Sequence, residues 1–350
     1  MSAPTLPIAL TPGDPCGIGP EIIARTWREQ PLLVHGCFVA GDAGVMRRAM
    51  ALVCGGVPFP VASIEAPSEA WWVPPGCLPV LQVVAPAPVL PWGVVDARAG
   101  QLAGECVLWA TRAALRGEVS AIVTAPLHKE ALHAAGAPWD QYPGHTELLQ
   151  AECARDAGVP LARMPVRMML ANDELRTVLV SIHLSMREAL DAITPQQVMQ
   201  TLQIAHDALL RLLGRVPRIA VAGVNPHAGE GGLFGREEIE VLQPVIAQAV
   251  AKGMDVLGPY APDTVFMRAR HAPGHPGEFD AVVAMYHDQG LIPVKYLGVE
   301  QGVNVTLGLP LIRTSPDHGT AFDLAGQGKA DASSLVQALR MARQLAGLPL

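Results

Sequence analysis

Positive charge is scarce in this sequence, and it is not concentrated in any segment. Charged residues make up 16% of the 350 residues, and 25 Lys and Arg against 32 Asp and Glu give a formal net charge of -7. The absence of a basic cluster argues against a nucleic-acid groove and against a polybasic membrane patch. We therefore expect small molecules as partners, with no nucleic acid and no membrane.

Long apolar runs are also missing. Pro or Gly interrupts each apolar segment before it could span a bilayer, so no transmembrane helix is predicted. The start, "MSAPTLPIALTPGD", lacks the basic region followed by an apolar stretch that is typical of a secretory signal. We expect a cytoplasmic protein.

The six cysteines are far apart and include no C-x-x-C pair, which excludes a zinc ribbon and argues against a disulfide framework. They are Cys16, Cys37, Cys54, Cys77, Cys106 and Cys153. We interpret them as reduced structural thiols. Cys16 differs from the rest because it lies inside a loop rich in Gly and Pro.

The chain also lacks the G-x-G-x-x-G fingerprint of ordinary dinucleotide-binding folds. Its first glycine loop, "TPGDPCGIGPEI" (11–22), joins a short apolar segment to a helix and is predicted to form a tight turn, with Glu21 near the helix N-terminus. A second loop, "NPHAGEGGLFG", could be an anion-binding nest of backbone amides or a solvated turn. A third, 313–331, combines Arg313 with three glycines and indicates a polar ligand.

What the sequence does contain is an alternation of strand-like and helical segments, which is typical of an α/β protein with a largely parallel sheet. Strands are predicted over 120–125, 176–184, 218–224 and 280–287. A helix is predicted to begin at Pro195, with Thr194 as its N-cap, Gln197 completing a capping box and Gly214 at its end. A further helix is predicted to follow Arg236. Only loops and short edge strands are expected over the Pro- and Gly-rich 55–100.

Three histidines follow three of these strands. His183 and His287 end predicted strands, His227 lies just past another, and Asp288 follows His287. Ligands bind at the carboxyl ends of strands in open α/β sheets, so convergent imidazoles there indicate a site for zinc, cobalt, nickel or manganese. No short-range spacing supports the set, and hydrogen-bonded structural histidines remain the alternative.

Two other histidines, His271 and His275, have i, i+4 spacing, but Pro and Gly between and beside them predict an exposed loop and not a helix. No clustering is visible for His35, His128, His133 or His206, for which surface or structural roles are expected.

Seven ordered motifs together resemble the 4-hydroxythreonine-4-phosphate dehydrogenase family of pyridoxine biosynthesis. They are "TPGDPCGIGPEI", "TAPLHKEALHAAG", "YPGHTELL", "NPHAGEGGLFGREE", "APDTVF", "AMYHDQGLIPVKY" and "GVNVTLGLPLIRTSPDHGTAFDLAGQGKADA". They cover most of residues 7–335. The segment "DHGTAFDLAGQGKA" is also similar to the nucleotide-binding loop of isocitrate and isopropylmalate dehydrogenases, which bind a nicotinamide cofactor without the missing fingerprint.

The resemblance implies a two-lobed isocitrate/isopropylmalate dehydrogenase-like fold with largely parallel sheets and an active site in the interlobe cleft at a dimer interface. The expected lobes are 1–125 with 300–350, which would include the nucleotide-binding loop, and 126–299, which would carry the metal ligands and the dimer interface. An obligate homodimer is implied, because in the family one metal ligand comes from the other subunit.

The resemblance also implies the site residues. Metal ligands fall on His183, His227 and His287, and substrate contacts fall on His145, Thr146, Lys295, Asn304 and Arg313. Catalytic roles fall on Asp263, Asp288 and Lys295, and cofactor contacts on Asp317, His318, Gly319, Asp323 and Gly326. The implied cofactors are NAD or NADP and a divalent ion, which would be zinc, cobalt or magnesium.

The implied reaction oxidises the C3 hydroxyl of 4-phosphooxy-L-threonine and then releases CO2 to give 3-amino-2-oxopropyl phosphate. Three departures from the family pattern bear on the substrate: Cys16 stands where Ala is usual, His128 stands where Asn is expected, and the stretch 267–278 is longer. Alternative substrates are 4-phospho-D-threonate, 4-phospho-D-erythronate and the dihydrodiol formed from terephthalate. A metal-dependent lyase without a nicotinamide cofactor is the alternative from another enzyme class.

Overall fold

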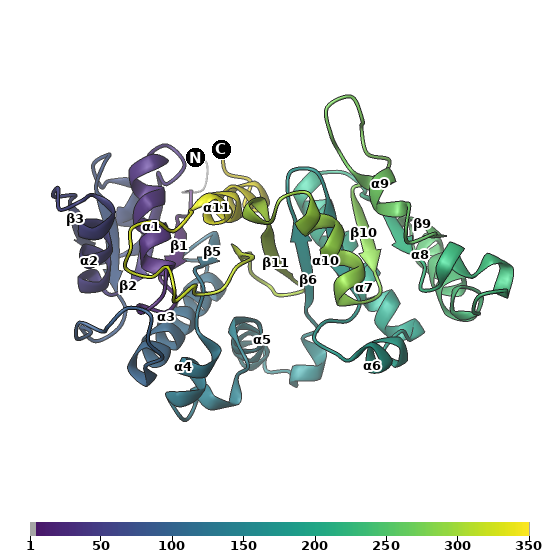
Figure 1. Cartoon of the computed structure of the whole chain (residues 1–350), viewed down its shortest axis with the longest axis horizontal. Helices are drawn as coiled ribbons and strands as arrows, with labels where there is room; N and C mark the ends of the chain where they lie inside the picture. Colours follow the sequence, from purple (N-terminus) through teal and green to yellow (C-terminus); the bar gives the residue numbers. More distant parts are fainter. Residues whose placement is uncertain (1–4, 350) are drawn as a thin grey trace. The chain divides into compact units, whose positions relative to one another are not determined.

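The computed structural model describes residues 5–349, which form two compact α/β units (Figure 1). One unit runs up to Pro165 and resumes at Leu309, and the other is Val166–Gly308. The expected class, α/β with largely parallel sheets, is confirmed. The observed division differs from the expected lobes chiefly because segment 126–165 joins the first unit, where its two helices pack against a long helix of that unit.

The described residues of the first unit form six strands, all parallel, in the order β3-β4-β2-β1-β5-β12. They are β1 (Ile8–Thr11), β2 (Cys37–Gly41), β3 (Val61–Ile64), β4 (Leu78–Gln82), β5 (Ala121–Thr124) and β12 (Arg313–Pro316). Every residue of β1, β2 and β5 is buried, as expected for central parallel strands covered on both faces. The short strands β3 and β4 lie within the Pro- and Gly-rich region where short edge strands are predicted.

The helices of this unit form two layers (Figure 1). They are α1 (Gly19–Glu29), α2 (Ala43–Val53), α3 (Ala97–Leu115), α4 (Lys129–Ala134), α5 (His145–Asp156) and α11 (Ser333–Leu345). From β1 the chain moves in one direction along the sheet through α1 and α2, and α3 carries it back in the other direction to β5. Because crossovers between parallel strands are right-handed, α3 lies on the opposite face of the sheet from α1 and α2. Helices α4 and α5 pack on α3, and α11 packs on α1.

The second unit contains six strands in the order β11-β6-β7-β10-β8-β9. They are β6 (Arg167–Ala171), β7 (Arg176–Leu179), β8 (Arg218–Ala222), β9 (Asp255–Tyr260), β10 (Ala281–Ala284) and β11 (Val303–Leu307). Strand β6 is antiparallel to both neighbours, and β7, β10, β8 and β9 are mutually parallel. The carboxyl ends of these four strands therefore share one edge.

The helices of the second unit are α6 (Met186–Asp191), α7 (Pro195–Leu213), α8 (Gln243–Ala251), α9 (Val265–Ala269) and α10 (His287–Tyr296). Both predicted ends of α7 are confirmed: Thr194 accepts a hydrogen bond from the Gln197 backbone N–H, and Gly214 ends the helix at φ 66°. The reciprocal half of the predicted capping box is wrong, because the Gln197 side chain accepts a hydrogen bond from Arg167.

The helix predicted after Arg236 is divided. Residues Glu238–Leu242 form a π-helical turn, and α8 follows it. Pro244 has no N–H to donate to the carbonyl four residues earlier, which explains why regular α geometry does not run through this point.

The remaining short 3-10 segments are Pro67–Trp71, Trp139–Gln141, Leu161–Arg163, Pro226–Gly232 and Val299–Gln301. The stretch 267–278 ends α9 and then forms a small turn closed by a bridge between Ala272 and His275, as the loop prediction requires. Within 5–349, none of the helices combines the length and the apolar character needed to cross a bilayer.

Candidate active site

The three histidines follow three adjacent strands of the second unit. Strand β10 lies between β7 and β8, and its residue Val283 is level with Val178 and Val221. Both β7 and β10 are shorter than predicted: His183 follows the end of β7 by four residues, and His287 is the first residue of α10. The histidines therefore lie in the loops at one edge of the sheet and not within the strands themselves.

His183 and His287 lie close together. Their ring centroids are 5.8 Å apart, and two imidazoles on one tetrahedral ion with bonds of about 2 Å would have centroids roughly 5 Å apart. The Nδ1 atom of His287 is 2.7 Å from Oδ1 of Asp288, so a proton on Nδ1 is favoured and Nε2 is left as the metal-binding nitrogen. The pair therefore suits two positions of a divalent-ion site.

Both rings line a hollow of about 200 Å³ at this edge of the sheet. Its lining is Ser181, Ile182, His183, Leu184, Met186, Ala189, Tyr286, His287 and Asp288. The space suits a small molecule better than a drug-sized one.

His227 begins a turn of unusual backbone geometry. Five consecutive residues, 227–231, have φ between 42° and 80°, and three of them are not glycine. Such left-handed conformations cost roughly 1 kcal/mol or more for each residue that has a Cβ. The second glycine motif thus forms a turn of left-handed residues.

A buried carboxylate holds this turn in place. Glu238 is 1% exposed, and its Oε1 accepts hydrogen bonds from the backbone N–H groups of Val224 at 2.7 Å and Asn225 at 2.8 Å. Its Oε2 accepts another from Asn225 Nδ2 at 2.9 Å. A Cβ on Gly229 would come within 2.7 Å of Glu238 Oε2, so the carboxylate packs directly against the turn.

His227 does not join the other two imidazoles within one chain. Its ring packs beside Phe234, with centroids 6.1 Å apart. Over residues 5–349, no group of three or more His, Cys, Asp or Glu side chains is arranged to hold a metal ion. The chain therefore provides two adjacent imidazoles and a third on the neighbouring strand end.

The other predicted residues of this unit are dispersed. Asp263 lies exposed in the turn after β9, at the same edge as the histidines. Asn304 on β11 is level with Leu170 and hence with Thr177, near the amino end of β7. Lys295 lies two turns after the start of α10, about 12 Å along the helix axis.

A hydrogen bond near the end of α10 indicates its direction: Asn172 donates to the Val294 carbonyl at 3.2 Å. Asn172 follows β6, which is antiparallel to β7, so α10 runs from the histidine edge back toward the amino end of β7. Lys295 and Asn304 therefore lie toward the edge of this sheet opposite to the one that carries the histidines.

In the first unit, Arg313, His145 and Lys129 lie close enough for their charges to interact. Arg313 is 3% exposed and donates hydrogen bonds to Thr124 Oγ1 at 2.8 and 3.1 Å. Burial lowers its pKa to about 10. Burial, together with the nearby positive charges of Arg313 and Lys129, lowers the pKa of His145 well below 6.5, so its imidazole is neutral at pH 7.

Thr146 lies beside His145 in the first turn of α5. Lys129 was missed in the sequence analysis. Its place just after strand β5, at the carboxyl edge of a parallel strand, was the signal that could have identified it.

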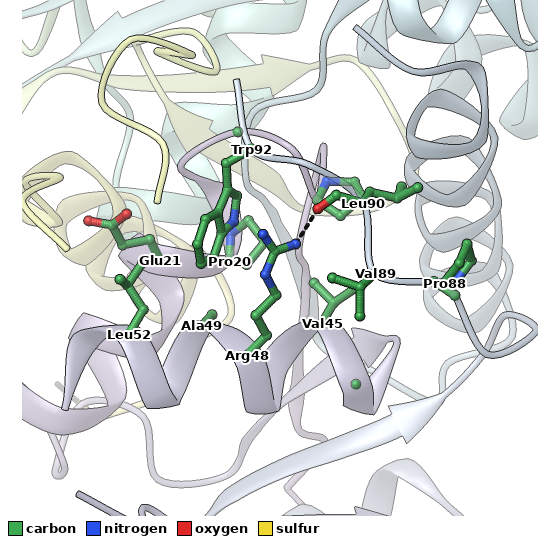
Figure 2. Close-up of a pocket in the computed structure, with 14 residues that line it drawn as sticks. Pro20, Glu21, Val45, Arg48, Ala49, Leu52, Pro88, Val89, Leu90 and Trp92 are labelled. Carbon is green, nitrogen blue, oxygen red and sulfur yellow. Dashed lines mark hydrogen bonds between the residues drawn. The ribbon is translucent and has the colours of Figure 1, made fainter. Parts of the chain in front are cut away.

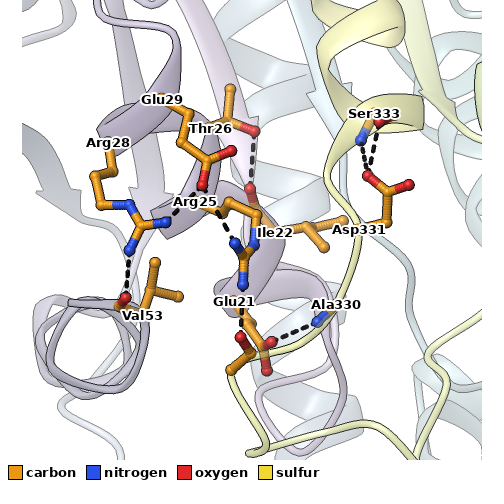
Figure 3. A network of polar contacts seen from close by, with 11 residues as sticks. Glu21, Ile22, Arg25, Thr26, Arg28, Glu29, Val53, Ala330, Asp331 and Ser333 are labelled. Atoms are coloured by element: carbon orange, nitrogen blue, oxygen red, sulfur yellow. Dashed lines mark hydrogen bonds and ion pairs between the residues drawn. The ribbon is translucent and has the colours of Figure 1, made fainter. Parts of the chain in front are cut away.

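The predicted cofactor residues follow β12 in one loop. They are Asp317, His318, Gly319, Asp323 and Gly326. Helix α1 and its N-cap residue Ile18 hold this loop through three hydrogen bonds, two of which are visible in Figure 3: Glu21 accepts from the Ala330 N–H at 2.8 Å, and Arg25 donates to the Gly328 carbonyl at 2.6 Å. The Ile18 N–H donates to the Thr320 carbonyl at 3.0 Å. The predicted position of Glu21 in the first turn of α1 is confirmed.

Trp92 supports the loop from another side. A Cβ on Gly326 would lie only 2.3 Å from the Trp92 ring. The Arg48 guanidinium lies 3.5 Å from the centroid of the same ring and donates to the Leu90 carbonyl (Figure 2). Arg48, Leu90 and Trp92 are among the residues that line a cavity of about 90 Å³ between α1, α2 and segment 87–92. Trp92 is thus a fixed wall behind the loop.

Two of the three departures from the family pattern, His128 and Cys16, also lie beside this loop. His128 stacks on Phe322 of the loop, with ring centroids 4.6 Å apart. Cys16 is fully buried, and burial raises the pKa of its thiol to about 12, so it is not a reactive thiolate. Burial also raises the pKa of Asp14 to about 6, although Asp14 accepts a hydrogen bond from the Cys16 N–H at 2.8 Å.

Comparison with known proteins gives consistent matches over nearly the whole chain. The family described as "Pyridoxal phosphate biosynthetic protein PdxA" matches residues 34–342. A 4-hydroxythreonine-4-phosphate dehydrogenase from Beijerinckia indica subsp. indica is 51% identical over 340 residues, which cover 97% of this chain and 95% of that protein. A D-threonate 4-phosphate dehydrogenase from Salmonella typhimurium is 48% identical over 351 residues, covering 98% and 99%.

Among solved structures, 4-hydroxythreonine-4-phosphate dehydrogenase from Klebsiella pneumoniae is similar with a TM-score of 0.83 and 44% identity. The match covers 98% of this chain and 100% of that one.

Proposed function

The chain belongs to the PdxA family of pyridoxal phosphate biosynthetic proteins, and on this basis we propose that it oxidises 4-phosphooxy-L-threonine at C3 with NAD+ or NADP+. The β-keto acid formed then loses CO2 to give 3-amino-2-oxopropyl phosphate. The resemblance predicted from seven motifs is confirmed, and the protein is an oxidoreductase of the dehydrogenase type.

The observation that carries the proposal is the imidazole pair of His183 and His287 at the carboxyl edge of the second unit's sheet. When bound there, a divalent ion such as zinc, cobalt or magnesium supplies Lewis acidity, which eases loss of a hydroxyl proton and stabilises negative charge on oxygen. His227 is the proposed third ligand. Asp288 orients the His287 ring through Nδ1, and Asp263 lies at the same edge, where it can accept or return a proton.

In the first unit, Arg313 and Lys129 provide positive charge for the anionic groups of the substrate. The neutral imidazole of His145 can donate one hydrogen bond and accept another without adding charge. Thr146, the next residue in the first turn of α5, is the proposed hydroxyl contact to the same substrate. Since Arg313 is already oriented by Thr124, its planar guanidinium would bind phosphate or carboxylate with little loss of side-chain freedom.

The cofactor loop of the first unit is the proposed nicotinamide nucleotide site. Its glycines allow the backbone to approach phosphate closely, and its attachment to α1 and Trp92 holds it in shape before the nucleotide binds. Asp317, His318, Gly319, Asp323 and Gly326 are the proposed contacts.

A homodimer is part of the proposal because one chain separates groups that must act on a single substrate. Lys295 and Asn304 lie toward one edge of the second unit's sheet, the three histidines lie at the other, and no three-ligand metal site forms among the described residues. A second copy can complete the site by supplying one of these groups.

A second candidate is the same chemistry on 4-phospho-D-threonate, which is favoured by the 48% identity to a D-threonate 4-phosphate dehydrogenase. Both substrates carry a phosphate and a C3 hydroxyl, so the groups described above serve either.

The test is absorbance of reduced nicotinamide when zinc- or cobalt-loaded protein meets NAD+ or NADP+ with each substrate in parallel. A rise with 4-phosphooxy-L-threonine alone supports the first function, and a rise with the D-threonate compound alone supports the second. No rise with either would contradict both.

A further inference from the structure

The side chain of Gln289 joins two of the strand ends that precede the histidines. Its Oε1 accepts a hydrogen bond from the Met285 N–H, just past β10, and its Nε2 donates to the Gly223 carbonyl, just past β8. Both distances are 2.7 Å. The orientation of this amide is determined by its partners, because the Met285 N–H can only donate and the Gly223 carbonyl can only accept.

A second side chain joins the third strand to the same point. Ser181 Oγ, just past β7, donates to the Met285 carbonyl at 3.0 Å. The Met285 carbonyl is therefore bonded to the segment after β7, and the Met285 N–H is linked through Gln289 to the segment after β8. Ser181 and Met285 each lie two residues before a histidine, and Gly223 lies four residues before His227.

These bonds begin where the sheet's own hydrogen bonds end. The last backbone bond from the β7 strand to β10 runs from the Val180 N–H to the Ala284 carbonyl, and the last aligned pair of β10 and β8 is Val283 with Val221. Beyond these points the backbone no longer determines the separation of the three chain segments. Side chains must set it, and Gln289 and Ser181 are in place to do so.

The first turn of α10 is also held tightly against the sheet. A Cβ on Gly290 would lie 2.4 Å from Leu179 Cδ2 and 3.0 Å from the Ala284 Cβ. The adjacent residue Gln289 is thereby brought close enough to reach both strand ends. The run His287, Asp288, Gln289, Gly290 thus combines a ligand, its orienting carboxylate, a bridging amide and a close contact.

We propose that Gln289 is a positioning residue that sets the spacing of His183, His227 and His287, with Ser181 completing the same bridge. This inference rests on the proposed function, because the spacing matters only if the three imidazoles bind a common ion. Gln289 itself is not a proposed ligand. It acts through the backbone at Met285 and Gly223, and so on the loops that carry the ligands.

The variant Gln289→Glu tests this role. It keeps the oxygen that accepts from the Met285 N–H and replaces the donor to the Gly223 carbonyl with a second oxygen. The matched control is Gln248→Glu, the same change at an exposed position of α8 in the same unit. Ser181→Ala is the second variant, since it removes only the bond to the Met285 carbonyl.

The measurement is zinc affinity of the full-length protein by competition with a chromogenic chelator, together with the visible spectrum of the cobalt-loaded form. Gln289→Glu is expected to weaken zinc binding about tenfold, the lower end of the range for residues that orient metal ligands, and to change the cobalt spectrum. Ser181→Ala should change both in the same direction by less, and Gln248→Glu should match the parent protein.

Three outcomes are distinct. If the parent protein binds no divalent ion, the proposed function fails before the inference is tested. If the parent binds zinc and Gln289→Glu binds it within twofold of the parent with the same cobalt spectrum, the positioning role is wrong. A lower melting temperature with unchanged zinc affinity in the folded variants would show that the bridge serves stability alone.

Discussion

The strained turn that carries His227 offers the most quantitative test of how the site is built. Residues His227, Ala228 and Glu230 hold left-handed conformations at roughly 1 kcal/mol each, so about 3 kcal/mol must be offset by contacts elsewhere. Besides backbone bonds within the turn, the contacts in place include the three hydrogen bonds that Glu238 accepts at its base. We predict that Glu238→Gln removes most of that compensation.

The magnitude follows from the donor arrangement. If the Gln oxygen keeps the two backbone N–H groups, its NH2 faces Asn225 Nδ2, donor against donor. If Asn225 rotates its amide to accept that bond, its oxygen faces Glu237 Oε2, which now accepts from Asn225 Nδ2 at 2.6 Å. The first arrangement leaves a buried donor unsatisfied, and the second sets two acceptors against each other at an exposed position. Both weaken two charge-assisted bonds, so the loss is about 1 to 3 kcal/mol. The loss is comparable with the strain, so the turn should relax.

The assay is urea unfolding combined with amide hydrogen exchange over 227–235. The control is Glu240→Gln, two residues later, whose exposed ion pair with Arg236 should contribute no more than about 1 kcal/mol. Glu238→Gln should be clearly less stable than the control, with faster exchange confined to the turn. Equal stability of the two variants, with unchanged hydrogen exchange in the turn, would show that Glu238 does not offset the strain of the turn.

Three further predictions concern other parts of the chain. Asp14→Asn should be more stable than the parent above pH 6 by up to about 3 kcal/mol, because a folded pKa of about 6 against 3.8 penalises the ionised carboxylate. The gain in stability should shrink as pH falls from 6 and vanish below about pH 4. A variant that is less stable than the parent at pH 8 in thermal melts would contradict this. Gly326→Ala should weaken NAD+ or NADP+ binding in nucleotide titrations because its Cβ would strike Trp92, whereas Gly76→Ala, at nearly the same φ with open space around it, should not; equal affinities in the two variants would count against a nucleotide role for the loop. Lys295→Met should raise the KM for the phosphorylated substrate about 10- to 100-fold but not that for its dephosphorylated analogue, and an equal rise for both would exclude a phosphate contact.

Local signals in the sequence predicted local structure well. Thr194, Pro195 and Gly214 determine both ends of α7 through hydrogen bonds and backbone preferences within a few residues. The three strands that precede the histidines were predicted for the same reason, since each is a short apolar run, although β7 and β10 end before the predicted residues. The edge they share followed from parallel strands, which have a common direction whatever their order.

Features that depend on distant residues could not be predicted from these signals. The order β7-β10-β8 places chain segments about 60 to 100 residues apart side by side, and nothing local specifies it. The left-handed turn requires Glu238, which lies 11 residues after His227. Lys129 and Arg313 influence the same imidazole although 184 residues separate them in the sequence.

The division of the chain is a further example. Helices α4 and α5 look like the start of a second lobe, because they follow a strand and a loop as the helices of any α/β repeat do. They belong to the first unit because their buried faces pack on α3. Sequence periodicity reports that a helix has an apolar face but not which element covers it.

In the proposed function, this dehydrogenase depends on a divalent ion held by His183, His227 and His287. This dependence is tested most directly by the rate of reduced nicotinamide formation from the phosphorylated substrate, measured on chelator-stripped protein before and after titration with zinc or cobalt. We expect no turnover without metal and recovery that saturates at one ion per active site. In His287→Ala we expect no recovery at metal concentrations near stoichiometry. Full turnover by the stripped parent protein would contradict this dependence.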